Sequence, residues 1–239
     1  NTSNTFGDFR PEVHDSDGLL MQTGQGEWIW HPLAWSKQLQ SNAFKDDHPK
    51  GFGLMQRDRD FSHYQDLEAV YHKRPSAWIQ PLSGFGQGEV RLIQLAARDE
   101  FMDNIVSFWT PARPPEPLQP VEIEYVIRWL GDAADLSPLG RCLSTRQDYQ
   151  EQPYYRHFFL EFAGGDLGKL GEPPLVDVNS PTGAAINQIK IEKNDFNQSW
   201  RVSFETSTAD NSKAVDLLCR LVTKEGAPLT ETWSYTWMP

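Results

Sequence analysis

The sequence predicts a mainly β protein in two parts, and three observations carry this prediction. Apolar and polar residues alternate cleanly over residues 121–130, as in a strand with one buried face. Short apolar stretches recur at close spacing after residue 139, each bounded by turn-forming residues. The first ~110 residues are instead irregular and crowded with Gly, Pro, Trp, Arg and Asp, with brief strands between long connections.

In this first part, residues 51–55 and 90–95 are predicted strands. The glycine-rich run at 84–88 lacks the context and the lysine of a phosphate loop, and we interpret it as a hairpin turn. Long loops in a compact domain commonly carry function, because their backbone can aim polar groups at a ligand. The first part is therefore the expected location of a site.

A proline-rich turn at 111–120 precedes the strand over 121–130, in which Val121, Ile123, Tyr125, Ile127 and Trp129 share one face. That face is expected to be buried. Turn formers then dominate, which predicts a linker at 133–139 between a domain at 1–132 and a second at 140–239.

The second domain is predicted to be an immunoglobulin-like sandwich, because about seven short strands in about 100 residues are typical of that fold. A short helical turn is expected at 165–170. The predicted strands cover residues 157–163, 174–179, 186–192, 199–206, 214–222 and 230–237.

Composition excludes several classes of function. Lysine and arginine number 22 against 33 acidic residues, a net charge of -11, which disfavours nucleic acid and anionic membrane surfaces as partners. No apolar run approaches the ~20 residues that span a bilayer, so we expect no membrane-embedded segment. Cys142 and Cys219 are compatible with one disulfide or with two buried thiols.

The first candidate site is Phe-Arg-Pro-Glu-Val-His-Asp-Ser-Asp-Gly at residues 9–18. From composition alone a surface Asx-turn is the commoner explanation, since Asp and Gly favour turns. Asp15 to Gly18 also matches part of a calcium loop, but the apolar residues that follow are wrong for one.

The second candidate is residues 56–66, where bases and acids alternate and His63 and Tyr64 follow. A solvated, salt-bridged loop is one interpretation. The other is a cleft wall that grips sugar hydroxyls, with Tyr71, Trp78 and Trp109 nearby as stacking faces, although core packing is the commoner role of Trp.

The third candidate is Asp103, which precedes an apolar strand at 105–109. If it were buried beside Phe101 or Trp109, its carboxyl would lose solvent and favour the protonated form that a general acid needs. A strand-capping Asp is the more frequent explanation of the spacing alone. The six histidines form no metal motif and no serine-hydrolase elbow is present, so we expect neither metal nor cofactor.

The order of these motifs resembles the MdoG (OpgG/OpgD) family of periplasmic glucan biosynthesis proteins, glycoside hydrolase family 186, from about residue 6 to the C-terminus. The matching segments are residues 9–18, 26–30, 51–61, 74–78, 103–106, 108–109 and 231–235.

This resemblance implies a periplasmic protein with a large β-sandwich, of which 1–132 is the C-terminal part, followed by the immunoglobulin-like domain. It implies action on β-1,2-glucan as an inverting endo-hydrolase, with transglycosylation in some relatives. Asp103 matches the family's general acid, Asp15 its general base and Tyr71 a substrate contact. The proton can be relayed through a sugar hydroxyl and water. Further expected substrate contacts are Arg57, Asp58, Asp60, Trp109 and Tyr155.

The alternative is a non-catalytic scaffold that presents glucan to a membrane glucan synthase. Residues 147–156 correspond to a variable loop that shapes the cleft in some members. In such members the loop can act across a dimer, so a homodimer is one possible assembly. Because the large domain of the family has a further upstream part, we expect the chain on its own to be inactive.

Overall fold

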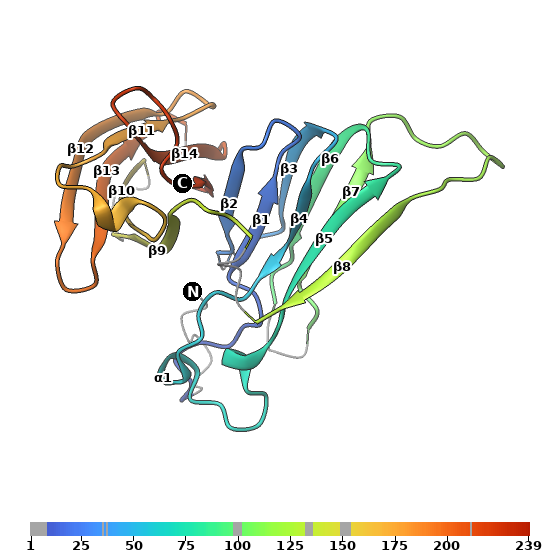
Figure 1. The fold of residues 1–239 in the computed structure, drawn as a ribbon, viewed down its shortest axis with the longest axis horizontal. Helices are drawn as coiled ribbons and strands as arrows, with labels where there is room; N and C mark the ends of the chain where they lie inside the picture. The colour runs from blue at the N-terminus through green and yellow to red at the C-terminus, as the bar shows by residue number, and fades with distance from the viewer. Residues whose placement is uncertain are drawn as a thin grey trace. The chain divides into compact units, whose positions relative to one another are not determined.

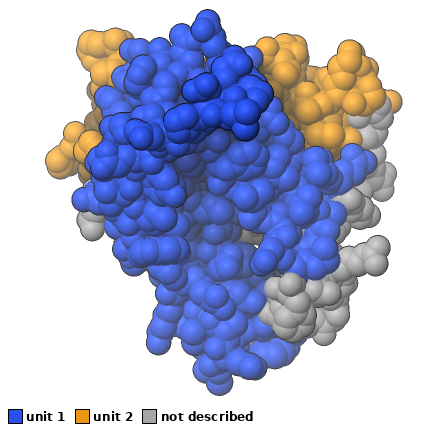
Figure 2. Space-filling model, turned by 90° about the vertical axis from the view of Figure 1, so that its right-hand side faces the viewer, with its two compact units in different colours: residues 1–28, 33–136 blue, residues 29–32, 137–239 orange. Residues whose placement is uncertain are grey.

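The computed structural model describes residues 9–34, 36, 38–97, 102–131, 136–148, 154–210 and 212–239. Strands dominate it, which confirms the predicted mainly β class. The chain divides into unit 1, Asn1–Trp28 with Leu33–Leu136, and unit 2, Ile29–Pro32 with Ser137–Pro239 (Figures 1 and 2).

One sheet of unit 1 contains β1 (Gly18–Gln22), β4 (Gly51–Met55), β5 (Ser76–Ser83) and β8 (Glu124–Leu130), and each strand is antiparallel to the next. The first four residues of β1 are buried, so both faces of this strand are covered. The predicted strand at 51–55 is confirmed with the same bounds.

A second sheet of unit 1 contains β3 (Gln40–Asp47), β6 (Gln87–Gln94) and β7 (Ile105–Pro111), again antiparallel. Val90 and Leu92 on one face of β6 have no exposed surface. Alternation of this kind places one face of a strand against the core.

Glycines let β4 lie close to β5. A Cβ on Gly53 would be 1.9 Å from the Ala77 carbonyl oxygen, and one on Gly51 would be 2.1 Å from the Trp78 ring. The space beside Gly51 is therefore filled by Trp78, which also stacks on Trp28 with ring centroids 5.7 Å apart.

The prediction that residues 121–130 form a half-buried strand is wrong in two respects. β8 begins only at Glu124, so Val121 precedes it. Both of its faces are exposed, since Trp129 is 68% and Val126 42% accessible on alternate positions. β8 lies at the end of the sheet, where only β5 pairs with it among the described residues, and side chains on the faces of a strand stay exposed where no second layer covers them. This side of unit 1 faces the reader in Figure 2.

The glycine-rich run at 84–88 is not a hairpin turn. β5 and β6 flank it but belong to different sheets, so the chain changes layer here. Gly84 has φ +82°, and a Cβ would meet the Glu122 carbonyl oxygen at 2.5 Å. Only glycine fits this conformation and this approach without strain.

Unit 2 has two sheets, drawn from yellow-green to red in Figure 1 except for residues 29–32, which belong to the blue β2 (Trp28–Pro32). In one, residues 29–32 run parallel to β15, and β14 and β11 follow antiparallel. In the other the order is β12-β13-β10-β9. The strands are β9 (Arg141–Gln147), β10 (Tyr155–Ala163), β11 (Leu175–Asn179), β12 (Ala185–Asn194), β13 (Ser199–Ser207), β14 (Val215–Val222) and β15 (Thr232–Trp237).

Each predicted strand of this region is confirmed to within a few residues, and the predicted helical turn is η2 (Leu167–Lys169). β9 was not predicted. Aromatic rings join the two sheets: Phe158 lies 5.7 Å from Trp233 and 5.4 Å from Tyr235, centroid to centroid. Two facing sheets fit a β-sandwich, while its immunoglobulin-like identity stays a prediction.

Cys142 and Cys219 are both buried and both free, which favours the thiol alternative over a disulfide. Burial raises the pKa of the Cys219 thiol well above its usual value. The helices are short: α1 (Phe61–Tyr64), η1 (Tyr71–Lys73) and η2. Within the described ranges, no helix has the length and apolarity needed to cross a bilayer.

Candidate functional site

Three loops of unit 1 meet at one end of the β1-β4-β5 sheet. Gly18, the first residue of β1, pairs with Met55, the last of β4, and β5 begins at Ser76 beside them. Residues 9–17, 56–60 and 69–75 therefore leave the sheet at the same end, beside α1 in Figure 1. The first two candidate motifs are thus neighbours.

The strand that follows Asp103 begins at this end too. Residues 33–34 lie between the two sheets' loops and connect them by hydrogen bonds. Each bond is donated by a backbone N–H: Leu33 to the Asp17 carbonyl at 2.8 Å, Ala34 to Gln94 Oε1 at 3.3 Å, and Leu95 to the Asn104 carbonyl at 2.7 Å. Asp15 and Asp103, 88 positions apart in sequence, thus lie on loops joined through one short series of contacts.

Both of these aspartates are exposed in this structure. The burial considered for Asp103 beside Trp109 is therefore not observed. Trp109 packs instead on Phe85, with ring centroids 5.8 Å apart, and Phe101 lies outside the described residues. Solvent-exposed carboxyls remain available to a ligand.

Asp17 anchors the loop that carries Asp15. Its Oδ2 accepts hydrogen bonds from the backbone N–H groups of Arg57 and of Asp58, the latter at 2.7 Å. Its own N–H donates to the Met55 carbonyl at 2.8 Å. The sequence places Asp17 in a turn motif, but nothing in the pattern indicated that it would hold the second motif.

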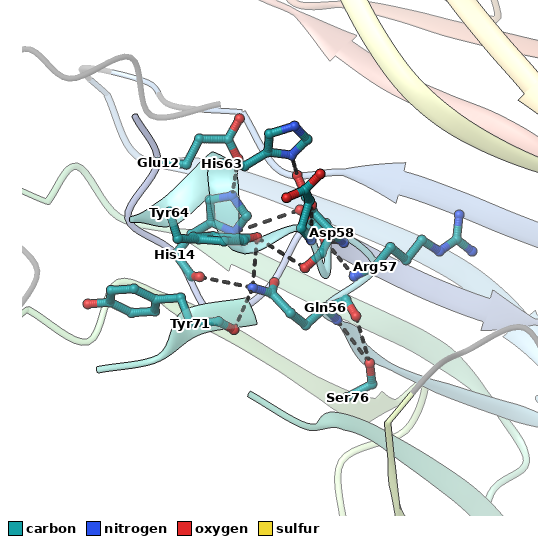
Figure 3. Close-up of polar contacts among 11 residues, drawn as sticks. Glu12, His14, Gln56, Arg57, Asp58, His63, Tyr64, Tyr71 and Ser76 are labelled. Carbon is teal, nitrogen blue, oxygen red and sulfur yellow. Dashed lines mark hydrogen bonds and ion pairs between the residues drawn. The ribbon is translucent and has the colours of Figure 1, made fainter. Parts of the chain in front are cut away.

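Gln56 lies at the centre of the polar network in Figure 3 and has no exposed surface. Its Nε2 lies within hydrogen-bond distance of three acceptors, which share its two hydrogens: the His14 carbonyl at 3.1 Å, the Tyr64 hydroxyl at 3.0 Å and the Tyr71 carbonyl at 3.2 Å. Its backbone N–H donates to Ser76 Oγ at 3.0 Å. Sequence reasoning missed this residue, because a single Gln after a strand carries no distinguishing signal.

Glu12 and His14 form a polar pair within the first motif, residues 9–18. His14 Nε2 lies 2.8 Å from Glu12 Oε2, and this bond lowers the pKa of Glu12. The His14 ring meets the edge of Tyr64 at 5.2 Å, centroid to centroid. Burial, followed by nearby carboxylates, raises the pKa of Tyr64, so its hydroxyl keeps its proton.

Within residues 56–66, Asp58 and His63 form an ion pair, whereas Asp66 pairs with Arg10 outside the segment and Arg59 bonds to main-chain carbonyls. Asp58 Oδ2 contacts His63 Nδ1 at 2.5 Å, which raises the pKa of His63. Asp60 is the N-cap of α1 and accepts from Ser62 N–H at 2.8 Å, and hydrogen bonding to Ser62 lowers the pKa of Asp60. Arg57 is half-buried and its side chain extends from the same loop (Figure 3).

Tyr71 is buried and opens η1. Its ring lies 6.1 Å from Tyr64, and the Arg74 guanidinium is 5.5 Å from its centroid. Arg59 Nη1 donates to the carbonyls of His72, at 3.2 Å, and Arg74, which ties η1 to the charged loop. Tyr71 is thereby fixed against both of the first two motifs.

Tyr155 lies in unit 2, at the start of β10. A hydrogen bond to the Glu205 carboxylate raises the pKa of its hydroxyl to about 12. Of the predicted cleft loop 147–156, residues 149–153 lie outside the described residues. A surface hollow of about 770 Å³, lined by residues 48–50 and 80–86, contains none of the candidate residues.

Comparison with known proteins identifies a family that matches almost the whole chain. A family model described as "Periplasmic glucan biosynthesis protein, MdoG" matches residues 1–237. The chain belongs to the MdoG family of periplasmic glucan biosynthesis proteins. This confirms the resemblance seen in the sequence, and the family's description agrees with the predicted periplasmic localisation.

Curated MdoG-family relatives are similar along the whole chain. The chain is 41% identical over 246 residues to the "Probable glucans biosynthesis protein D" of Shewanella oneidensis, covering 100% of this chain and 46% of the relative. It is 40% identical over 242 residues to the "Glucans biosynthesis protein D" of Xylella fastidiosa, covering 97% and 45%. The chain thus spans about half the length of the curated relatives it matches.

Proposed function

We propose that the protein cleaves β-1,2-linked glucan as an inverting endo-hydrolase that serves glucan biosynthesis. The observation that supports this proposal is the series of hydrogen bonds that links the Asp15 loop to the Asp103 loop within unit 1, through Asp17, residues 33–34 and Asn104. Glycoside hydrolysis with inversion needs two carboxyl groups on opposite sides of the scissile bond.

In the proposed reaction, Asp103 donates its proton to the glycosidic oxygen as the bond from that oxygen to the anomeric carbon breaks. A water attacks the anomeric carbon from the opposite face, and its proton passes to Asp15, directly or through a sugar hydroxyl and water. The anomeric centre is inverted, and the two carboxyls exchange their protonation states before the next turnover.

The remaining predicted contacts are proposed to hold the glucan. Tyr71 is fixed beside the Asp15 loop, and Arg57 extends from the neighbouring loop. Asp58 and Asp60 already bond within their loop, so we propose that they shape its surface. Trp109 and Tyr155 are half-buried and are proposed as outer contacts.

The test is incubation of the whole natural protein with linear β-1,2-glucan, beside Asp103→Asn and Asp15→Asn. We expect shorter oligosaccharides from the wild type, and at least about a 10²-fold loss in each variant. Cyclised products from the wild type would show that the reaction is transglycosylation and not hydrolysis. Glucan binding without conversion would support the alternative, a scaffold that hands glucan to a membrane synthase.

A further inference from the structure

The Gln56 carboxamide is a buried polar group whose contacts all lead to the candidate site. Its Nε2 has three acceptors within 3.2 Å: two main-chain carbonyls, of His14 and Tyr71, and the Tyr64 hydroxyl. Its Oε1 is buried and has no hydrogen-bond partner among the described residues. The donor side of this amide, and not its acceptor side, is thus fully used.

The orientation of the amide follows from its neighbours. A carbonyl oxygen can only accept, so the group that faces both His14 and Tyr71 has to be the NH₂. The Tyr64 hydroxyl accepts from Gln56 and donates to the Asp58 carbonyl at 3.3 Å. Turning the amide over would place its oxygen against two carbonyl oxygens, neither of which can donate.

The two carbonyls belong to segments that carry different proposed site residues. His14 directly precedes Asp15, the proposed general base, and Tyr71 is the proposed substrate contact. The two segments are 57 positions apart in sequence, from His14 to Tyr71, and one nitrogen atom holds both. The Asp17 contacts fix the same loop to residues 57–58 but do not reach Tyr71.

We propose that Gln56 is a positioning residue that sets the place of Asp15 relative to Tyr71. This inference rests on the proposed function. Gln56 does not touch the substrate and takes no part in proton transfer; it acts through the main chain of two neighbours. Small displacements of catalytic groups are costly, because a shift of about 1 Å can reduce the rate by about 10²-fold.

Gln56→Glu tests this directly, because the side chain keeps its shape while the NH₂ becomes a carboxylate oxygen facing two carbonyls. Above its pKa the new group has no donor, and below it has one O–H. We therefore expect kcat per folded molecule to fall by about tenfold to a hundredfold at neutral pH and to recover in part as the pH is lowered. Gln56→Met, which never carries a donor, should lose kcat without any such recovery.

The ratio of kcat for Gln56→Glu to kcat for Gln56→Met is followed against pH. Titration of the other ionisable groups affects both variants and therefore largely cancels in this ratio. The ionisable groups around Gln56 are Glu12, His14, Asp17, Asp58, Arg59, Tyr64 and Tyr71. Gln198→Glu is the matched control: its exposed amide donates to the Asp195 carbonyl at 2.9 Å in unit 2. This control should leave kcat unchanged.

The measurement is kcat and KM on linear β-1,2-glucan between about pH 5 and 8, with the folded fraction of each variant taken from its melting curve. A fall in kcat in both variants, with partial recovery at low pH for Gln56→Glu only, supports the role of Gln56 as a positioning residue. A variant that loses thermal stability but keeps wild-type kcat per folded molecule makes Gln56 merely structural and overturns the inference. A wild type without turnover would instead overturn the proposed function, and the inference with it.

Discussion

The carboxylate of Asp17 caps the backbone of Asp58, with Oδ2 accepting the Asp58 N–H at 2.7 Å. The same oxygen accepts a hydrogen bond from the Arg57 N–H, so one carboxylate satisfies two main-chain donors of the 56–66 segment. These hydrogen bonds hold together two loops that are distant in sequence, where β1 begins and β4 ends.

Asp17→Ala should therefore destabilise unit 1. It leaves two part-buried N–H groups without an acceptor, which costs about 1–3 kcal/mol. Asp17→Asn retains an acceptor oxygen and should cost less. Thermal melting of the whole protein measures both, and equal melting temperatures for the two variants would contradict the capping role.

Gly53→Ala should be destabilising because its Cβ would lie 1.9 Å from the Ala77 carbonyl oxygen. β4 and β5 would have to separate, at a cost of about 1–3 kcal/mol. Gly86→Ala is the matched control in the same unit, since nothing lies within 4 Å of its Cβ position. Melting temperatures that fall equally in the two variants would refute the close approach of the strands.

His31 predicts acid sensitivity of unit 2. The side chain is buried, 3.4 Å from Ser234 Oγ, and burial lowers its pKa to about 4. The folded state then binds fewer protons than the unfolded state between about pH 6.5 and 4, so stability falls as the pH falls through this window. Each pH unit costs about 1.4 kcal/mol, or about 2 kcal/mol by pH 5.

The check is the unfolding of the wild type and His31→Asn at pH 7 and pH 5. The variant should be less sensitive to the change in pH than the wild type. The exposed His48, as His48→Asn, serves as the control and should keep the wild-type dependence. A pH dependence that is the same in all three proteins would exclude His31 as its source.

Cys142 and Cys219 should be unreactive in the folded protein. Both are buried and free, and the raised pKa of the Cys219 thiol keeps it protonated. A thiol-reactive chromophore should label neither cysteine natively and both after denaturation without reductant. Absence of labelling in denaturant would mean that the two cysteines form a disulfide.

The sequence predicted most strands of unit 2, because alternation over short segments reports directly on the buried face of a sheet. It could not predict that β8 exposes both faces, since burial depends on which neighbours a strand has. Likewise Gly84 indicated a turn correctly, but a turn between strands of one sheet and a turn between two sheets have the same local chemistry.

The motif order singled out Asp15 and Asp103 as the proposed pair, whereas the structural supports of their loops were not foreseen. Gln56 and Asp17 act through main-chain groups of distant segments, and such contacts depend on the fold and not on local pattern. Asp60 was expected to grip sugar, and it caps α1, a role consistent with the preference of Asp for that position.

The most direct test of the acid–base pair is the anomeric configuration of the first product. Time-resolved proton NMR of linear β-1,2-glucan with the whole wild-type protein should show the α-anomer before mutarotation, and Asp103→Asn should give no product on the same timescale. A β-anomer formed first, or an Asp103→Asn variant as active as the wild type, would contradict an inverting mechanism in which Asp103 is the acid.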